Sequence, residues 1–201
     1  MGSKATIRQS LIDVDDSVLI AIDIQDHFLS KYDAAISQPV LEKVVWLVKL
    51  ATYLDVPIVA MGEDIEGIGT LNQSLLEALP DETKVHNKLS FGLAGQPEIL
   101  ASVQKTGRST AILIGMETDV CVAQSALGLM ENGYQVVVAR DAVITTVGGE
   151  VVGLNRMHDA GAVISSVKAI HYEWLRTVEN TVDMYEAASE LGKNVPDSLD
   201  L

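Results

Sequence analysis

The sequence contains a single cysteine, Cys121, among its 201 residues. A lone cysteine cannot form an intramolecular disulfide, and the chain has no paired cysteine or histidine spacing of the kind that holds structural zinc. The one thiol lies where an apolar run ends and a helical pattern begins. Its position raises the question of whether it is a nucleophile or a small buried hydrophobe.

Basic residues are also scarce. The 14 Lys and Arg are outnumbered by 28 Asp and Glu, which gives a formal net charge of −14. Such a charge opposes attraction to phosphate backbones and to anionic lipid. No run approaches the roughly 18 to 20 apolar residues of a membrane span, and residues 1–17 lack a signal-peptide pattern. We therefore expect no nucleic-acid partner, no membrane partner and a cytoplasmic location.

Short runs rich in β-branched residues alternate with longer segments of helical spacing. Runs that predict strands covered on both faces are residues 17–23, 56–62, 109–116, 134–141 and 162–167, with a weaker strand at 83–88. Segments that predict helices are residues 39–54, 71–79, 96–107, 122–133 and 149–161, with one or two closing helices in 171–191. This alternation predicts a Rossmann-like, three-layer α/β/α fold with a mostly parallel sheet of about six strands.

Glycine and proline positions agree with these boundaries. Gly107, Gly133 and Gly161 each follow a helical run and precede a strand, as glycines at helix C-termini do. Pro39 and Pro97 fit the first turns of their helices. No repeat or linker divides the chain, so residues 1–201 are expected to form a single domain ending in a polar tail at 194–201.

Three reactive side chains fall where predicted strands end, which is where open α/β sheets collect their ligands. Asp23 ends the most apolar strand of the N-terminal half, Lys88 ends the weak strand, and Cys121 opens a helix whose N–H groups favour a thiolate. A thiol, a carboxylate and an ammonium could together perform nucleophilic catalysis. The alternatives are a turn residue, a solvated surface lysine and an inert core thiol, and spacing alone does not show that the three meet.

Three motifs in order resemble those of the isochorismatase-like cysteine hydrolases. DIQDHF at 23–28 is similar to D-x-Q-x-x-F, KLSFG at 88–92 to K-x-x-F-S, and GMETDVCV at 115–122 to G-x-x-T-x-x-C-V. The first two are weak alone, but the ordered set, followed by GYQVVVARDAV and MHDAGAVISS, is specific. The resemblance covers residues 14–180 approximately and leaves a helical extension and tail at about 181–201. The superfamily includes nicotinamidases, N-carbamoylsarcosine amidases and many enzymes of unknown substrate.

By this resemblance, Cys121 is the nucleophile, Asp23 the general base and Lys88 the ion-pairing third member. The resemblance also implies a cis peptide bond between Met116 and Glu117, and an oxyanion hole formed by the backbone N–H groups of Glu117 and Cys121. Lys84 is the alternative to Lys88, because it lies four residues earlier in the same predicted strand.

Substrate contacts are expected from loops beside these motifs. The candidates are Gln25, Phe28, Phe91 and Thr118. Phe28 and Phe91 are the only phenylalanines, and both lie within motifs, so they fit an apolar pocket wall. Core packing is their ordinary alternative.

The expected metal content is none. Nicotinamidases carry an Asp-x-His metal site after the strand that here ends VPIVAMG, whereas this chain continues GEDIEGIGTL without histidine. Glu63, Asp64 and His86 are the residues that could in principle coordinate an ion. No cofactor is implied.

The leading interpretation is a metal-independent cysteine hydrolase that cleaves a small amide or related C–N bond through a thioester on Cys121. The alternatives are a vinyl-ether or ester hydrolase on the same scaffold, and a non-catalytic binding or scaffold subunit. The partner is expected to be a small-molecule substrate. The resemblance also implies a homo-oligomer, a dimer or tetramer, for which Trp174, Leu175 and Met184 could offer apolar surface or else pack onto their own sheet.

Overall fold

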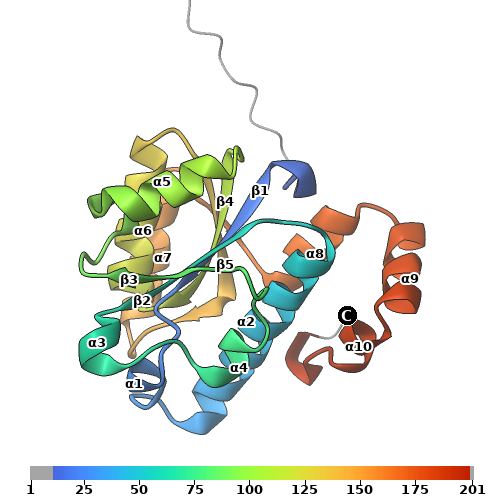
Figure 1. Cartoon of the computed structure of the whole chain (residues 1–201), viewed down its shortest axis with the longest axis horizontal. Coiled ribbons are helices and arrows are strands. Elements are labelled where there is room, and N and C mark those ends of the chain that lie inside the picture. The colour runs from blue at the N-terminus through green and yellow to red at the C-terminus, as the bar shows by residue number, and fades with distance from the viewer. Residues whose placement is uncertain (1–10, 200–201) are drawn as a thin grey trace, which may run out of the picture.

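A six-stranded parallel sheet forms the centre of the molecule in a computed structural model that describes residues 11–199 (Figure 1). The strand order is β3-β2-β1-β4-β5-β6. The strands are β1 (Ser17–Ile22), β2 (Ile58–Glu63), β3 (Val85–Lys88), β4 (Thr110–Met116), β5 (Gln135–Ile144) and β6 (Val163–Ser165). The predicted fold class is confirmed, including the weak strand that ends at Lys88.

The strand order reverses between β1 and β4. The chain runs outward from β1 through β2 to β3 on one side, then returns to β4 beside β1 and continues outward through β5 to β6. β1 and β4 pair along their whole length, from Ser17 opposite Thr110 to Ile22 opposite Gly115. Because ligands of open α/β sheets bind where the order reverses, the carboxyl ends of β1 and β4 mark the site position.

Helices cover both faces of the sheet (Figure 1). One face packs mainly against α2, α4 and α8, and the other against α5, α6 and α7, each through its own apolar cluster. The helices are α1 (Asp26–Leu29), α2 (Ala34–Tyr53), α3 (Ile65–Ile68), α4 (Gln73–Leu76), α5 (Pro97–Lys105), α6 (Ala123–Glu131), α7 (Gly149–Asp159), α8 (Val167–Leu175), α9 (Val178–Ala187) and α10 (Ser189–Lys193). None of those within residues 11–199 combines the length and apolar character needed to cross a bilayer.

Helix boundaries agree with the glycines but not with both prolines. Gly107, Gly133 and Gly161 follow α5, α6 and α7 with positive φ, as predicted, and Pro97 is the first residue of α5. Pro39 is not in a first turn, because α2 begins five residues earlier at Ala34. The Asp33 carbonyl already accepts hydrogen bonds from the two backbone N–H groups at 36 and 37.

Other predicted elements also differ in extent. The helix predicted at 71–79 is the single turn α4. The strand predicted at 134–141 continues to Ile144, past a register shift between Leu113 and Gly115 of β4. The strand predicted at 162–167 is only β6, and it is not covered on both faces. It is an edge strand on which Val163 is 42% exposed, and α8 begins directly at Val167. Apolar composition alone therefore overestimated the burial of this edge.

The C-terminal helices pack onto their own chain. Trp174, Leu175 and Met184 are all buried in the apolar cluster beneath α2, so they do not form an oligomer surface. The Trp46 indole N–H donates to the Leu191 carbonyl at 3.2 Å, and Leu199 is buried in the same cluster. Leu199 thus gives the described part of the polar tail an apolar anchor within the chain.

His171 lies fully buried on α8 between aromatic rings. Its ring centroid is 5.2 Å from that of Trp46 and 4.7 Å from that of Tyr172. Among the described residues, neither ring nitrogen has a hydrogen-bond partner. Burial lowers the pKa of His171 to about 4, because the charged imidazolium would lose its hydration without gaining a partner.

We predict that His171 makes the protein less stable in acid. A histidine whose pKa is lower in the folded state binds more protons when unfolded, so its share of the free energy of unfolding falls as pH drops from about 6.5 to about 4. Urea unfolding of His171→Phe across this range should show less of that loss than wild type. The same substitution at the exposed His158 is the control, and parallel slopes for wild type and His171→Phe would contradict the prediction.

Candidate active site

Asp23 leaves β1 with a left-handed backbone that turns the chain at the carboxyl edge of the sheet. Its φ is 52°, a region that non-glycine residues seldom adopt. Its N–H donates to the Met61 carbonyl at 2.9 Å, and its own carbonyl accepts from the Gln25 N–H at 2.9 Å. The turn is therefore fixed from both sides, and the carboxylate is fully buried.

Cys121 follows β4 within a π-helical turn, Thr118–Val122, that precedes α6. The Met116–Glu117 peptide bond is cis. Gly115, just before it, has φ 122°, and a Cβ there would overlap the Ile22 carbonyl oxygen, so only glycine lets β4 lie this close to β1. Cys121 thus occupies an irregular turn and not the first turn of α6, which begins at Ala123.

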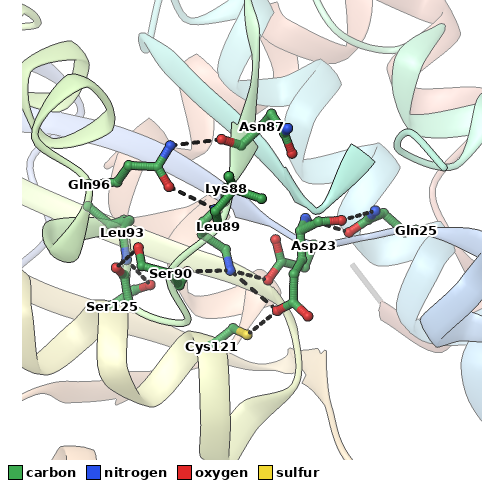
Figure 2. Close-up of polar contacts among 12 residues, drawn as sticks. Asp23, Gln25, Asn87, Lys88, Leu89, Ser90, Leu93, Gln96, Cys121 and Ser125 are labelled. Atoms are coloured by element: carbon green, nitrogen blue, oxygen red, sulfur yellow. Dashed lines mark hydrogen bonds and ion pairs between the residues drawn. The ribbon is translucent and has the colours of Figure 1, made fainter. Parts of the chain in front are cut away.

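Lys88 reaches Asp23 from two strands away. Its Nζ lies 2.9 Å from Asp23 Oδ2, and both side chains are 0% exposed (Figure 2). The same Nζ donates to the Ser90 carbonyl at 3.0 Å. Neither Asp23 oxygen accepts a well-directed hydrogen bond from any residue in 11–199, so the contact is chiefly ionic. The Asp23 carboxylate therefore keeps the capacity to accept a proton.

Glu63 closes the cluster from the end of β2. The Cys121 thiol donates to Glu63 Oε2 at 3.3 Å, and Lys88 Nζ lies 3.6 Å from the same oxygen. Ligand atoms of Asp23, Glu63 and Cys121 lie within 4.8 Å of one another. The structure thus brings the three sequence candidates together and adds a second carboxylate. Glu63 has the same sequence pattern as Asp23, an acid directly after an apolar strand, and this pattern is the signal that could have identified it as a member of the cluster.

The charges of the cluster shift its protonation equilibria. Burial raises the pKa of Asp23 to about 6, and this effect outweighs the lowering by Lys88. Burial lowers the pKa of Lys88, but the combined effects of Asp23, Cys121 and Glu63 outweigh it and leave that pKa raised. Burial and the Asp23 carboxylate raise the pKa of the Cys121 thiol against the smaller opposing effect of Lys88. The surroundings therefore do not favour the thiolate that a helix start would predict, because the sulfur is buried and two carboxylates lie beside it.

A metal ion does not fit this cluster well. The Lys88 ammonium already lies 2.9 Å from one carboxylate and 3.6 Å from the other, where it balances their charge and would repel a divalent cation. His86 is not part of the cluster. Its side chain lines a separate cavity with Thr52 and Ser102.

The four expected substrate residues have different surroundings. Gln25 is buried, and its amide bonds three groups: Nε2 donates to the carbonyls of Glu63 at 2.8 Å and Gly69 at 2.6 Å, while Oε1 accepts from the Glu63 N–H at 2.7 Å. These contacts give Gln25 a structural role, which is to hold the end of β2 against the turn after β1. Phe28 packs with Met116 and Ile144 in a small apolar cluster.

Phe91 and Thr118 each have a side-chain group that a ligand could contact. Phe91 is 56% exposed and so is not a core residue. Thr118 is buried, and its hydroxyl has no hydrogen-bond partner among the described side chains and backbone. This hydroxyl lies three residues before the cysteine, and a ligand could supply the hydrogen-bond partner that it lacks.

Together, the fold and this cluster define a three-layer α/β protein with a cysteine, a lysine and two carboxylates at the reversal point of its sheet. The isochorismatase domain model matches residues 17–169, and the chain belongs to the isochorismatase family. It is 30% identical over 176 residues to the secreted isochorismatase effector Isc1 of Phytophthora sojae, covering 85% of this chain and 82% of that protein.

Two further comparisons agree with this assignment. Isochorismatase family protein 1A of Dictyostelium discoideum is 28% identical over 165 residues, covering 78% of this chain and 77% of that one. The crystal structure of the Escherichia coli YcaC gene product, described as an octameric hydrolase of unknown specificity, superposes with a TM-score of 0.85 at 26% identity. The superposition covers 96% of this chain and 94% of that chain.

We predict that the two charged neighbours change Cys121 alkylation in opposite directions. Asp23→Asn removes an anion that opposes the thiolate, so the alkylation rate at pH 7.5 should rise, whereas Lys88→Met should lower it. Each pKa unit corresponds to about tenfold in thiolate fraction. The measurement is the iodoacetamide rate from pH 6 to 10 with intact folding checked by circular dichroism.

The matched control is Lys84→Met, since Lys84 is exposed just before β3. It should leave the rate unchanged. A slower rate in Lys84→Met and an unchanged rate in Lys88→Met would assign the third member to Lys84.

Proposed function

We propose that the protein is a metal-independent cysteine hydrolase that cleaves a small amide or related C–N bond through a thioester on Cys121. The observation that carries this proposal is the fully buried Lys88–Asp23 ion pair at 2.9 Å beside the only cysteine of the chain. Burying two charges is costly, and a carboxylate next to a thiol supplies the base that a nucleophilic thiol needs.

In the first half of the proposed reaction, the Cys121 sulfur attacks the substrate carbonyl carbon while Asp23 accepts the thiol proton. A pKa of about 6 suits a base that must be ionised near neutral pH yet able to return the proton. The backbone N–H groups of Glu117 and Cys121 would receive the oxyanion. Collapse breaks the C–N bond, and the proton on Asp23 passes to the departing nitrogen.

In the second half, a water attacks the thioester carbon and gives its proton to Asp23. The C–S bond then breaks, the carboxylic acid product leaves, and the sulfur regains a proton from Asp23. Lys88 keeps the buried Asp23 ionised between these steps. The Thr118 hydroxyl and the exposed Phe91 ring are the proposed substrate contacts.

We predict that Cys121→Ala loses turnover by at least about 10³-fold, the scale expected when a nucleophile is removed. Hydrolysis of p-nitrophenyl acetate, with mass spectrometry of the quenched protein, should show an acetyl group on Cys121 in wild type only. Wild-type turnover should also fall as pH drops through about 6, because the Asp23 carboxylate becomes protonated.

The alternatives give different results in the same experiment. A vinyl-ether or ester hydrolase that does not use the sulfur would keep its activity in Cys121→Ala. A non-catalytic subunit would form no acetyl enzyme and would turn over neither the ester nor small amides. A folded Cys121→Ala variant is required for either conclusion.

We also propose that the chain self-associates and acts in the cytoplasm. The octameric state described for YcaC supports self-association. The cytoplasmic location stays a prediction from the sequence, and the relative in Phytophthora sojae is described as secreted.

A further inference from the structure

Glu63 differs from the other charged members of the cluster in its exposure. Asp23 and Lys88 are 0% exposed, whereas 24% of the Glu63 side chain is open to solvent. The Glu63 backbone is held on both sides by the Gln25 amide, at 2.7 Å and 2.8 Å. Its carboxylate is therefore carried by a fixed strand end and not by a loose loop.

The Glu63 carboxylate borders the reactive sulfur. Oε2 accepts the hydrogen bond of the Cys121 thiol at 3.3 Å, with Lys88 Nζ 3.6 Å away. The charged and titratable groups that face it are Lys88 from β3, Asp23 after β1 and Cys121 after β4. Two carboxylates and one ammonium leave one net negative charge when both acids are ionised. Of Asp23, Lys88 and Glu63, only Glu63 has solvent contact, so the excess negative charge lies on the Glu63 carboxylate.

We propose that Glu63 determines the substrate charge of this site, favouring neutral or cationic substrates that offer an N–H and rejecting those with a carboxylate near the reacting carbon. The inference rests on the proposed function, because it assumes that chemistry occurs at the Cys121 sulfur. A substrate N–H can replace the thiol as the donor to Glu63 Oε2. A substrate carboxylate in the same place would meet a like charge within a few ångströms.

A charge preference at Glu63 would restrict the class of substrates that the site accepts. Amides and ureas with a free N–H next to the reacting carbonyl satisfy the Glu63 oxygen, whereas a dicarboxylate such as isochorismate brings two anions to an already anionic edge. Within the family, Glu63 would therefore direct this chain toward C–N bonds and away from the vinyl-ether substrate.

Alkylation by a matched pair of reagents tests the charge preference without a known substrate. Iodoacetamide is neutral and iodoacetate is anionic, and both react by the same step: the Cys121 sulfur forms a C–S bond, the C–I bond breaks, iodide leaves, and the thiol proton passes to solvent. The ratio of the two rates cancels effects on the thiol pKa. Each ratio is divided by that of free cysteine, which removes the intrinsic difference between the reagents.

We predict that wild type prefers iodoacetamide, and that Glu63→Gln, which keeps the shape and removes the charge, lowers this preference about tenfold. Glu66→Gln, a neighbouring exposed acid on α3, is the control and should keep the wild-type ratio. Glu63→Asp, which keeps the charge, should retain most of the preference. An unchanged ratio in a folded Glu63→Gln variant would overturn the inference.

A second measurement does not depend on any variant. In wild type, 2-bromoethylammonium, iodoacetamide and iodoacetate should react in that order of decreasing rate relative to free cysteine. Equal relative alkylation rates for the three reagents would refute the charge preference. Failure of the proposed function looks different, since either Cys121→Ala would retain turnover or wild type would show none, whatever the alkylation ratios are.

Discussion

The buried ion pair between Lys88 and Asp23 is the constraint on which the site depends. Each charge alone would cost several kcal/mol to remove from water, and typically about 3–5 kcal/mol is lost when one partner of such a pair is deleted. The pair spans three strands, because Lys88 ends β3 and Asp23 follows β1. The carboxyl edge of the sheet must therefore keep its strand order and register for either charge to be tolerated.

Close contact between β1 and β4 places the sulfur next to this pair. Gly115 permits that contact, since any Cβ at its position would overlap the Ile22 carbonyl. The turn that carries Cys121 then starts from a fixed point beside Asp23. Gly115 therefore serves both the packing of β4 on β1 and the position of Cys121. This explains why a glycine stands six residues before the cysteine.

Two carboxylates and one lysine give the site a protonation state that a lone triad would not have. Burial keeps the Asp23 pKa near 6 and, together with the carboxylates, keeps the thiol protonated at neutral pH. A thiol in this state is protected from adventitious oxidation, because the thiolate is the reactive form. In the proposed reaction, proton transfer to Asp23 would accompany attack on the substrate and not precede it, which would link nucleophile activation to substrate binding.

The sequence by itself determined the fold class, the six strands, the approximate ends of α5, α6 and α7, and the identity of Asp23, Lys88 and Cys121 as residues at or just after strand ends, since periodicity and turn residues are local properties. It did not determine that α2 extends back to Ala34, that β6 is an exposed edge, or that Phe28 is packed while Phe91 is not. Only the tertiary structure decided that Glu63 and not Asp64 or His86 joins the cluster, and that the Cys121 pKa rises. The cluster and the raised pKa both depend on the strand order β3-β2-β1-β4, which brings side chains from distant segments to one edge of the sheet. The pKa of a buried group is set by neighbours that no local sequence pattern specifies.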